Sequence, residues 1–442
     1  MSTLGSVLNS ALKSMTANQL ALSVASNNIA NAGNPEFTRQ RLLTAPAGSD
    51  GGMLGIGTGV DVVGVEAMRD RLIEARLRQE TSMKSGADTL ANGLSNVEAL
   101  FNDSDGTGLL QSLTNFFNSF QTLSQDPASL GFREQLKINA NALIGALHAR
   151  NTDLANIQSN ADKASAAKLA QINRLSAGIA DLTKQIKFEE VTHPANDLRD
   201  RRETMVKELS QYVEVHELDS GSEYQLATKD NRLLVLNETA QTLSAADVTA
   251  AIGAGSLKAE IDIRDTYVPA YLGALDQLAY EVSQQVNSIH SAAYDLDGNT
   301  GIDFFAPLAS AAGALGLIDL SSDVAGDARK IAASRLAAGN DNRAAVELGN
   351  LLYKPVFSGG AVTEQYGALI FSIGTDVSSA QSNLDEHQAL VSQLQNRRQS
   401  LSGVSIDEET IQILQFQRSF QASARLIQAV DELLQVTLGL GA

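Results

Sequence analysis

The sequence predicts a mainly α-helical protein with an inserted β domain. Apolar residues recur with heptad spacing at both ends of the chain, which is the pattern of packed helices. Aromatic residues make up 5% of the chain and Trp is absent, so small and aliphatic contacts dominate, as in helix bundles. One stretch of short β-prone runs interrupts the helical patterns. At 442 residues, we expect two or three domains.

The first expected element is a helix from Leu4 to about Ile29. An apolar residue recurs there every seven positions, at Leu8, Met15, Leu22 and Ile29, and Leu4, Ala11 and Ala25 lie four residues ahead of their partners in the same seam. Lys13 is the only charged residue before Glu36. A helix that borders water usually has a charged outer face. We therefore expect this helix to be buried against other helices.

The last expected element is a helix from Ile406 to Leu440. Its apolar residues are also seven apart, at Ile406, Ile413, Phe420, Ile427 and Leu434, and Phe416 fills a companion position. Three acidic residues, Asp407 to Glu409, begin it and suit the positive end of the helix dipole. We predict that residues 1–44 and 402–442 form one coiled-coil-like terminal domain.

Long helices are also predicted between the two ends. Heptad-like runs near residues 172–186, 268–289 and 373–394 predict a long-helix bundle body. We assign residues 45–210, 264–300 and 360–401 to this body, with a Gly-rich turn and strand at residues 51–65. Residues 211–263 read as a small antiparallel β unit with turns at "DSGS" and "KDN". We group that unit with residues of about 301–359 as a small outer domain.

The charge of the chain excludes some classes of partner. A formal net charge of −18 repels phosphate backbones and anionic lipid surfaces, so we expect no nucleic-acid and no membrane partner. The absence of Cys excludes disulfides and thiol catalysis. The first 35 residues lack both a basic region and an unbroken apolar region. We therefore expect no cleaved secretory signal.

No motif of catalysis or of cofactor binding stands out. The five His residues have no metal-ligand spacing, and His387 is expected to be a hydrogen-bonded residue of a helix seam. "GIGTGV" near Gly55 lacks the third Gly of a phosphate loop. The acidic run "DLDGNTGIDFF" that begins at Asp295 lacks the Gly and Glu positions of a calcium loop, and reads as an Asx turn that closes a helix. We predict no enzyme, no cofactor and no metal site.

The stretch "SNNIANAGNPEFTRQR", residues 26–41, resembles the N-terminal signature of bacterial flagellar axial proteins. That signature is an S-N-N-I-A-N-x-x-T-P-G-Y-like run after the first helix. This sequence departs from it at Asn34, Glu36 and Phe37. The T-R-Q-R ending, Thr38 to Arg41, is similar to the hook-associated protein 1 family.

Four further stretches carry the same resemblance over nearly the whole chain. Residues 402–434, which begin "SGVSIDEE", resemble that family's S-G-V-N-L-D-E-E element, with Ser405 and Ile406 in place of Asn and Leu. The others are "GTGVDVVGVEAMRD", "NDLRDRRETMVKELSQYVEV" and "RDTYVPAYLGALDQLAYEVSQQVNSIHSAAYDLDGNTGIDFF". Only 24 residues separate Phe305 from "KIAASRLAAGNDNR", which begins at Lys330, where larger family members carry outer β domains. We expect the outermost domain to be reduced or missing.

The resemblance implies a structural component of the bacterial flagellum that joins the hook to the filament. It implies type III export and a place outside the cell, at the hook–filament junction. The implied partners are further copies of the chain, the hook protein, the second hook–filament junction protein and an export chaperone on the C-terminal helix. Neither a cofactor nor a catalytic role is implied.

The heptad positions and the segment after the first helix supply candidate residues for the assembly interface. Isolated helices with a narrow apolar seam are marginal in water, so we expect both ends to order only on assembly. Pro35 is expected to stop the first helix, and Arg39 and Arg41 to bridge to acidic groups of a neighbouring subunit. The candidates are Leu8, Met15, Leu22, Ile29, Asn31, Pro35, Arg39, Arg41, Ile413, Phe416, Phe420, Ile427 and Leu434.

Two alternatives remain open. A hook or distal-rod axial protein shares the terminal elements, but such proteins are β-rich between their ends. An extracellular enzyme or an adhesin on an axial-protein frame belongs to a different class, and dispersed carboxylates leave that class open.

Overall fold

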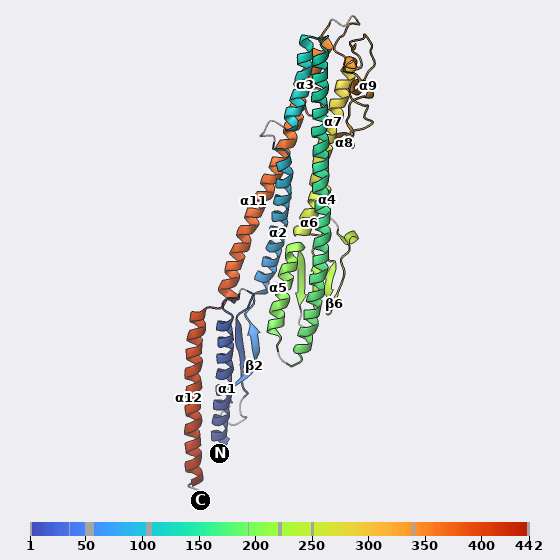
Figure 1. Ribbon diagram of the computed structural model, residues 1–442. Helices are drawn as coiled ribbons and strands as arrows, with labels where there is room; N and C mark the ends of the chain where they lie inside the picture. The colour runs from blue at the N-terminus through green and yellow to red at the C-terminus, as the bar shows by residue number, and fades with distance from the viewer. Residues whose placement is uncertain are drawn as a thin grey trace. The chain divides into compact units, whose positions relative to one another are not determined.

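The computed structural model describes residues 2–34, 36–48, 57–102, 108–192, 194–219, 223–248, 252–337 and 341–439. These residues are mostly helical, with two small antiparallel sheets (Figure 1). The predicted fold class, mainly α with an inserted β element, is confirmed.

The chain folds into two compact units. The first, here called the terminal unit, contains Met1–Met83, Ala170–Gly253 and His387–Ala442. The second, here called the bundle unit, contains Lys84–Leu169 and Ala254–Glu386. Three long helices contribute residues to both units: α2 (Arg71–Leu100), α4 (Leu130–Glu189) and α11 (Val362–Ser402).

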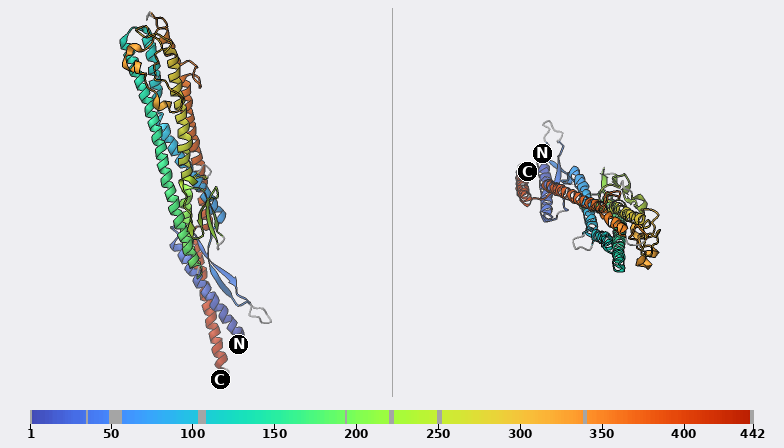
Figure 2. Two further views of the ribbon diagram at one scale, coloured as in Figure 1. Left: turned by 90° about the vertical axis from the view of Figure 1, so that its right-hand side faces the viewer. Right: turned by 90° about the horizontal axis from the view of Figure 1, so that it is seen from above.

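The terminal unit pairs the two ends of the chain. Helices α1 (Ser2–Ala30) and α12 (Ile406–Gly439) lie side by side (Figures 1 and 2). The two-stranded sheet of β1 (Gln40–Pro46) and β2 (Val60–Ala67) packs on α1, and a bulge lies between Leu43 and Thr44. The predicted strand at residues 51–65 is found from Val60 onward, while residues 51–56 lie outside the described part.

A second sheet of the terminal unit follows α5 (Asn196–Tyr212). Its antiparallel order is β3–β4–β5–β6. Alternate residues of β4 are buried, as expected for a sheet with one covered face. The strands and the short 3₁₀ helix after them are β3 (Val215–Asp219), β4 (Tyr224–Thr228), β5 (Leu233–Leu236), β6 (Thr239–Ala240) and η1 (Ala245–Asp247).

The bundle unit combines long and short helices. Its longer elements besides α2, α4 and α11 are α3 (Leu109–Gln125) and α7 (Val268–His290), and a π turn η2 (Ile263–Tyr267) precedes α7. The shorter helices are α6 (Ser256–Asp262), α8 (Ala314–Leu317), α9 (Ser322–Gly326), η3 (Ala328–Lys330), α10 (Arg343–Gly349) and η4 (Asn350–Leu352).

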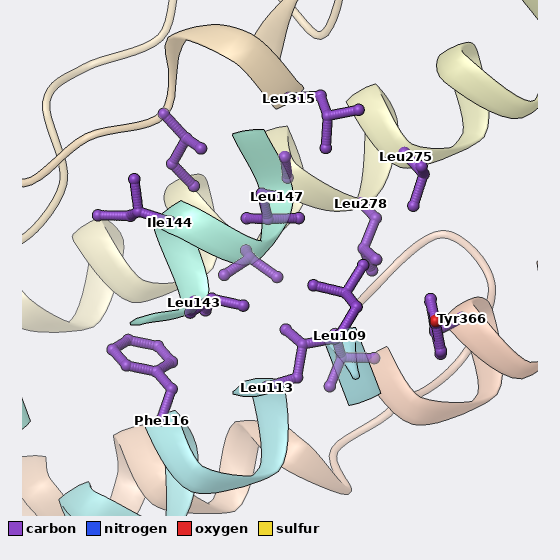
Figure 3. Packing of buried hydrophobic residues seen from close by; sticks show 14 of the residues in the cluster. Leu109, Leu113, Phe116, Leu143, Ile144, Leu147, Leu275, Leu278, Leu315 and Tyr366 are labelled. Carbon is purple, nitrogen blue, oxygen red and sulfur yellow. The ribbon is translucent and has the colours of Figure 1, made fainter. Parts of the chain in front are cut away.

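The core of the bundle unit is aliphatic with one aromatic cluster. Figure 3 shows leucines of α3, α4 and α7 converging, among them Leu113, Leu143 and Leu275, all at most 1% exposed. Phe116 lies at 5.6 Å from Phe304, measured between ring centroids. Burial of this apolar surface is the main force that holds the unit together.

The predicted end of the β unit at Ile263 is wrong. The last strand ends at Ala240, and residues from Ser256 onward are helical. Gly255 has a φ of 117°, which Gly tolerates, and it precedes α6. Leu257 and Ile261 are four apart and both buried, so the helical period outweighs the β-prone composition of this stretch.

The two units group the chain differently from the three predicted domains. Residues 211–253 belong with the chain ends, whereas residues 301–359 belong to the bundle unit. The division into a terminal domain, a body and an outer domain stays a prediction.

Two smaller predictions are confirmed. Asp295 follows the end of α7, and its Oδ1 accepts the backbone N–H groups of Asp297 at 2.9 Å and Asn299 at 2.8 Å, which is an Asx-type turn. His387 on α11 is hydrogen-bonded, because its Nδ1 lies 2.9 Å from Glu80 Oε2 on α2.

Candidate assembly interface at the chain termini

Helices α1 and α12 run antiparallel with a fixed register. The Asn28 side-chain amide donates to Glu409 at 3.0 Å, and Ser423 Oγ donates to Ser14 Oγ at 3.1 Å. These contacts are separated by the same number of residues in each helix, since 28 − 14 = 14 and 423 − 409 = 14. Fourteen residues are about two heptads, the repeat of a coiled coil. The two chain ends therefore form an antiparallel helix pair within one molecule.

The predicted seam of α12 faces α1. Five candidate residues are half-buried and, with Val430, belong to a series with steps of three or four residues that includes Glu409 and Ser423, which bond to α1. They are Ile413, Phe416, Phe420, Ile427 and Leu434. Val430 belongs to the same face and is 3% exposed. The heptad pattern thus located the contact face of α12.

On α1 the predicted seam matches the buried face in part, because its Ala11 and Ala25 are each 2% exposed. The candidate residues Leu8, Met15, Leu22 and Ile29 are only half-buried. The fully buried residues of α1 are small or polar: Ala11, Ala17, Ala21, Ala25 and Asn28. Small side chains let two backbones approach closely, so the large residues fall to the edge of the contact. Ala11, Ser14, Asn18, Ala21, Ala25 and Asn28 do repeat every three or four residues, and this signal was present in the sequence.

Two further candidates lie at the end of α1. The Asn31 side-chain amide donates to the backbone oxygen of Asn27 at 3.0 Å and to its side-chain oxygen at 3.1 Å. Helix α1 ends at Ala30, and residues 31–33 form turns. Pro35, the predicted helix stop, lies outside the described residues.

Arg39 pairs within its own chain. Its Nε lies 2.7 Å from Glu409 Oε1 and its Nη1 lies 2.8 Å from Glu408 Oε2. Arg41 pairs with Glu66 of β2 at 3.2 Å, where both side chains are more than half exposed. Sequence reasoning had expected both arginines to reach a neighbouring subunit. Arg41 remains accessible for that role, whereas Arg39 is engaged at the base of α12.

Glu409 is the residue that sequence reasoning missed. Its side chain is 1% exposed and accepts hydrogen bonds from Asn28 and Arg39. Asn28 also accepts the backbone N–H of Gln40 at 3.0 Å and donates to its carbonyl at 2.8 Å. A buried carboxylate needs such partners, because leaving water costs several kcal/mol. Asn28, Arg39, Gln40 and Glu409 therefore form one hydrogen-bonded cluster.

A second ionic network lies in the same unit, beside a cavity of about 540 Å³. Arg78 contacts Glu203 at 2.5 Å and Glu217 at 2.9 Å, while Arg69 pairs with Asp200. Burial raises the pKa of Glu217, and the Glu203 carboxylate adds to that rise. Burial also raises the pKa of Asp200, although Arg69 opposes it. The arginines are matched by carboxylates, so the network reads as structural.

The outer face of the helix pair carries several large apolar side chains. On α12 the exposed side chains at Leu426 and Leu433 lie about 120–140° around the helix from Phe420, at 100° per residue. Leu433 is 54% exposed. The large exposed apolar residues of this face, here called the outer stripe, are Ile411, Leu414, Leu426, Leu433 and Val436, and α1 adds Val7, Leu12 and Leu20. Arg418, Arg425 and Glu432 are exposed on the same face, so the apolar side chains of the outer stripe lie among charged ones.

In the described part of the chain, no group of three or more His, Asp or Glu side chains could hold a metal ion. None of the described helices is long and apolar enough to span a membrane.

Comparison with protein families gives two matches. The model described as "Flagellar hook-associated protein FlgK helical domain" matches residues 94–251 and 244–305. The model described as "Flagellar basal body rod FlgEFG protein C-terminal" matches residues 395–440, which include nearly all of α12.

Individual proteins give similar results. The chain is 28% identical over 503 aligned positions to flagellar hook-associated protein 1 of Bacillus subtilis, covering 98% of each. It is 32% identical over 332 positions to flagellar hook-associated protein 1 of Salmonella typhimurium, covering 68% of this chain and 59% of that protein. The solved structure of the flagellar hook junction protein FlgK from Burkholderia pseudomallei has the same fold, with a TM-score of 0.66 and 15% identity over 74% of this chain and 100% of that one.

Proposed function

The chain belongs to the flagellar hook-associated protein 1 family, and on that premise we propose that it joins the flagellar hook to the filament. It is a structural component of the flagellum, and it assembles with other flagellar components. We propose that its neighbours are further copies of itself, the hook protein and the second hook–filament junction protein. We also propose export through the type III apparatus without a cleaved signal.

One observation supports self-assembly most directly: the helix pair has large apolar side chains on a face that its own chain leaves exposed. In an isolated two-helix coiled coil, polar side chains would occupy that face. Leu433 and Val436 are instead more than half exposed. Covering apolar surface stabilises an assembly by about 25 cal/mol per Å². Neighbouring subunits that cover the outer stripe supply that stabilisation.

The candidate residues divide into two roles in this proposal. Those of α12 that face α1, such as Phe416 and Phe420, hold the two chain ends together. The outer stripe contacts neighbouring subunits, together with the half-buried edge of α1 at Leu8, Met15, Leu22 and Ile29. Arg41, more than half exposed, can exchange Glu66 for a neighbour's acidic group. Head-to-tail repetition of such a contact generates rings or helical tubes.

The free subunit is proposed to hold its ends less tightly than the assembled one. A helix pair with one face exposed buries little apolar surface, so its folding is coupled to assembly. Before export, the apolar α12 helix would need protection from aggregation. This is the proposed role for an export chaperone.

Rod and hook proteins are the closest alternative. The rod-type match at residues 395–440 is restricted to the C-terminal element, so α12 does not discriminate between axial proteins. The match at residues 94–305 is to the hook-associated helical domain and favours the junction role. An enzyme or adhesin has no comparable observation in its support.

The experiment that tests this function places acidic residues on the outer stripe. In the bacterium that carries this chain, the native gene is replaced by the double variant Leu426→Glu and Leu433→Glu. Because both residues are exposed in the subunit, the purified variant should keep the helix content and melting temperature of the parent. We expect cells that carry it to lose swimming and their filaments, since the charged stripe cannot be buried between subunits.

A matched control uses Gln428→Glu, which adds an acidic residue at an exposed polar position of the same helix. We expect this variant to swim normally. Normal swimming and normal filaments in the double variant would contradict assembly through the outer stripe. If the control also fails to swim, the result shows only that α12 does not tolerate acidic substitution. The experiment would then no longer support assembly through the outer stripe.

A further inference from the structure

A groove of about 490 Å³ lies between α7 and α11 of the bundle unit. Its size falls within the range of about 300–1,000 Å³ that is typical of binding pockets. It belongs to a different unit from the terminal helices, so it takes no part in the proposed assembly contact. The lining residues near its centre are Tyr267, Tyr271, Leu278, Tyr366, Leu369 and Asp376.

The floor of the groove is part of the hydrophobic core. Leu278, Tyr366 and Leu369 are at most 8% exposed, and Figure 3 shows Leu278 on α7 and Tyr366 on α11 at the side of the core cluster. The rim is made of small residues, since Ala274 of α7 and Ala368 of α11 are both exposed. Small side chains at the rim keep the groove open above this buried floor.

Aromatic rings form one wall. The ring centroids of Tyr267 and Tyr271 are 6.4 Å apart with an interplanar angle of 40°. Tyr267 ends the π turn η2, and Tyr271 lies one turn further along α7. A π turn carries an extra residue and rotates the side chains that follow, and such turns are frequent at functional sites. Tyr267 is half-buried, whereas Tyr271 is 3% exposed.

Asp376 alone carries a charge among the described residues that line the groove. Its Oδ2 accepts a hydrogen bond from the Tyr271 hydroxyl at 2.8 Å, and it forms no ion pair with any described residue. Arg264, three residues before Tyr267, pairs with Asp162 and Asp265, and Lys258 pairs with Asp262. Burial raises the pKa of Tyr267 and the Asp376 carboxylate adds to that rise, so its field reaches both tyrosines.

The groove therefore combines an unpaired carboxylate, aromatic rings and an apolar floor. The face of a tyrosine ring attracts a cation, and a carboxylate beside it adds to the attraction. A bare metal ion is disfavoured, because one carboxylate supplies too few oxygen ligands. Arginine and lysine fit better, since their side chains carry an aliphatic stem behind the charge.

We propose that this groove binds the side chain of an arginine or lysine that a partner protein presents. The cationic end lies beside Asp376 and Tyr267, and the stem lies on Leu278 and Leu369.

The absence of Cys from the chain gives a direct test in the full-length protein. Ala274→Cys places a single thiol at the rim of the groove. Its rate of modification is measured with two methanethiosulfonate reagents of similar size, one with a trimethylammonium group and one with a sulfonate group. Ala142→Cys, at an exposed position of α4 outside the groove, serves as the reference.

At each position we take the rate of modification by the cationic reagent divided by the rate for the anionic reagent. We expect this ratio to be about tenfold higher at position 274 than at position 142. Adding Asp376→Asn should abolish most of this excess at position 274 and leave the ratio at position 142 unchanged. An excess that is absent, or that survives Asp376→Asn, would overturn the proposal.

A second measurement asks whether the groove recognises the side chain itself. Nα-acetylarginine amide and its neutral isostere Nα-acetylcitrulline amide are added as competitors for modification at position 274. Protection by the arginine compound alone supports the proposal, whereas equal protection by both, or by neither, overturns it.

Tyr267→Leu keeps the carboxylate but removes the ring face at a half-buried position. It should weaken protection by the arginine compound several-fold without changing the melting temperature. If Asp376→Asn does not fold, Tyr267→Leu alone tests the proposal. The proposal is then overturned if the arginine compound protects position 274 equally well with and without Tyr267→Leu. Because none of these measurements involves the flagellum, they separate this groove from the proposed assembly function.

Discussion

Arg39 Nε lies 2.7 Å from Glu409 Oε1, so a salt bridge joins two residues that are 370 positions apart. The Arg39 side chain is 14% exposed and that of Glu409 is 1% exposed, which places the pair away from most of the solvent. The backbone N–H of Arg39 also donates to the carbonyl of Ser402 at 3.0 Å, just before α12 begins. The segment after α1 is thus fastened to the base of α12.

Glu409→Gln should loosen the pairing of α1 with α12. The substitution keeps the shape of the side chain but leaves Arg39 without its buried counter-charge, and breaking a buried pair costs about 3–5 kcal/mol. Hydrogen exchange followed by mass spectrometry should show faster exchange throughout residues 2–30. Glu408→Gln is the control, because Glu408 is 62% exposed and such surface pairs contribute about 0–1 kcal/mol. Equal exchange in both variants would contradict a special role for Glu409.

His290 should make the bundle unit sensitive to acid. Its Nδ1 lies 2.7 Å from the Ile302 carbonyl, and its Nε2 accepts the backbone N–H of Ala332 at 2.7 Å. Protonation of Nε2 would place its N–H against the backbone N–H of Ala332, so that two donors face each other without an acceptor. Burial lowers the pKa of His290 to about 4, and the nearby Arg133 lowers it further while Asp295 opposes. The unfolded chain therefore binds a proton more readily than the folded one.

The sign of the pH effect follows from that difference. Stability should fall as pH drops from 6.5 towards about 4, by up to roughly 3 kcal/mol, because only the unfolded state gains the proton. Denaturant unfolding at pH 7.5, 6 and 5 measures the loss. His290→Gln is less stable at pH 7.5, but the difference between it and the parent should shrink on acidification. A constant difference would show that His290 does not titrate in this range.

Arg133 should stabilise the bundle unit through backbone carbonyls rather than through an ion pair. It is 2% exposed, and it donates from Nη2 to the Pro127 carbonyl at 2.6 Å and from Nη1 to the Ile331 carbonyl. Burial lowers its pKa to about 10. Arg133→Met keeps the stem but leaves both carbonyls without this donor, at a cost of about 2–4 kcal/mol.

Thermal unfolding measures this cost. Arg150→Met is a suitable comparison, because the Arg150 side chain is 23% exposed and pairs with Asp153 only one turn away. That variant should lose less than about 1 kcal/mol. If Arg133→Met were as stable as the parent, other groups would be satisfying the two carbonyls.

Gly403 should be required for the stability of the connection between α11 and α12. A Cβ at this position would lie under 3.0 Å from the carbonyl oxygen of Gln399, and that backbone atom cannot rotate away. Gly403→Ala should therefore shift the chain after Ser402 and lower the melting temperature, with a loss of about 1–3 kcal/mol. Circular dichroism during heating follows this change.

Gly367→Ala, within α11, should give the opposite result. Nothing lies within 4 Å of a Cβ at Gly367, so Ala there should raise stability by about 0.5–1 kcal/mol through helix propensity. A melting temperature that falls for both variants, or for neither, would refute the steric explanation at Gly403.

The helices were predictable because their signals are local. The heptad pattern at Ile413, Phe420 and Ile427 located the contact face of α12, and the Asx turn at Asp295 followed from residues within one loop. The end of the β unit was misjudged, because β-prone residues near Ile263 are helical once Leu257 and Ile261 pack into the interior. The heptads of α1 were informative in part, since Ala11 and Ala25 of the predicted seam are buried while the larger Met15 and Leu22 are half-buried.

The sequence by itself determined that the chain is mainly helical and that both ends carry seamed helices, because side chains three and four apart share a face whatever the fold. The tertiary structure alone decided that α1 and α12 pair with Asn28 opposite Glu409, and that Arg39 is engaged within its own chain. Those outcomes depend on which distant backbone approaches closely enough to exclude water. Small residues at the contact permit that approach, and a buried carboxylate then takes the nearest donors.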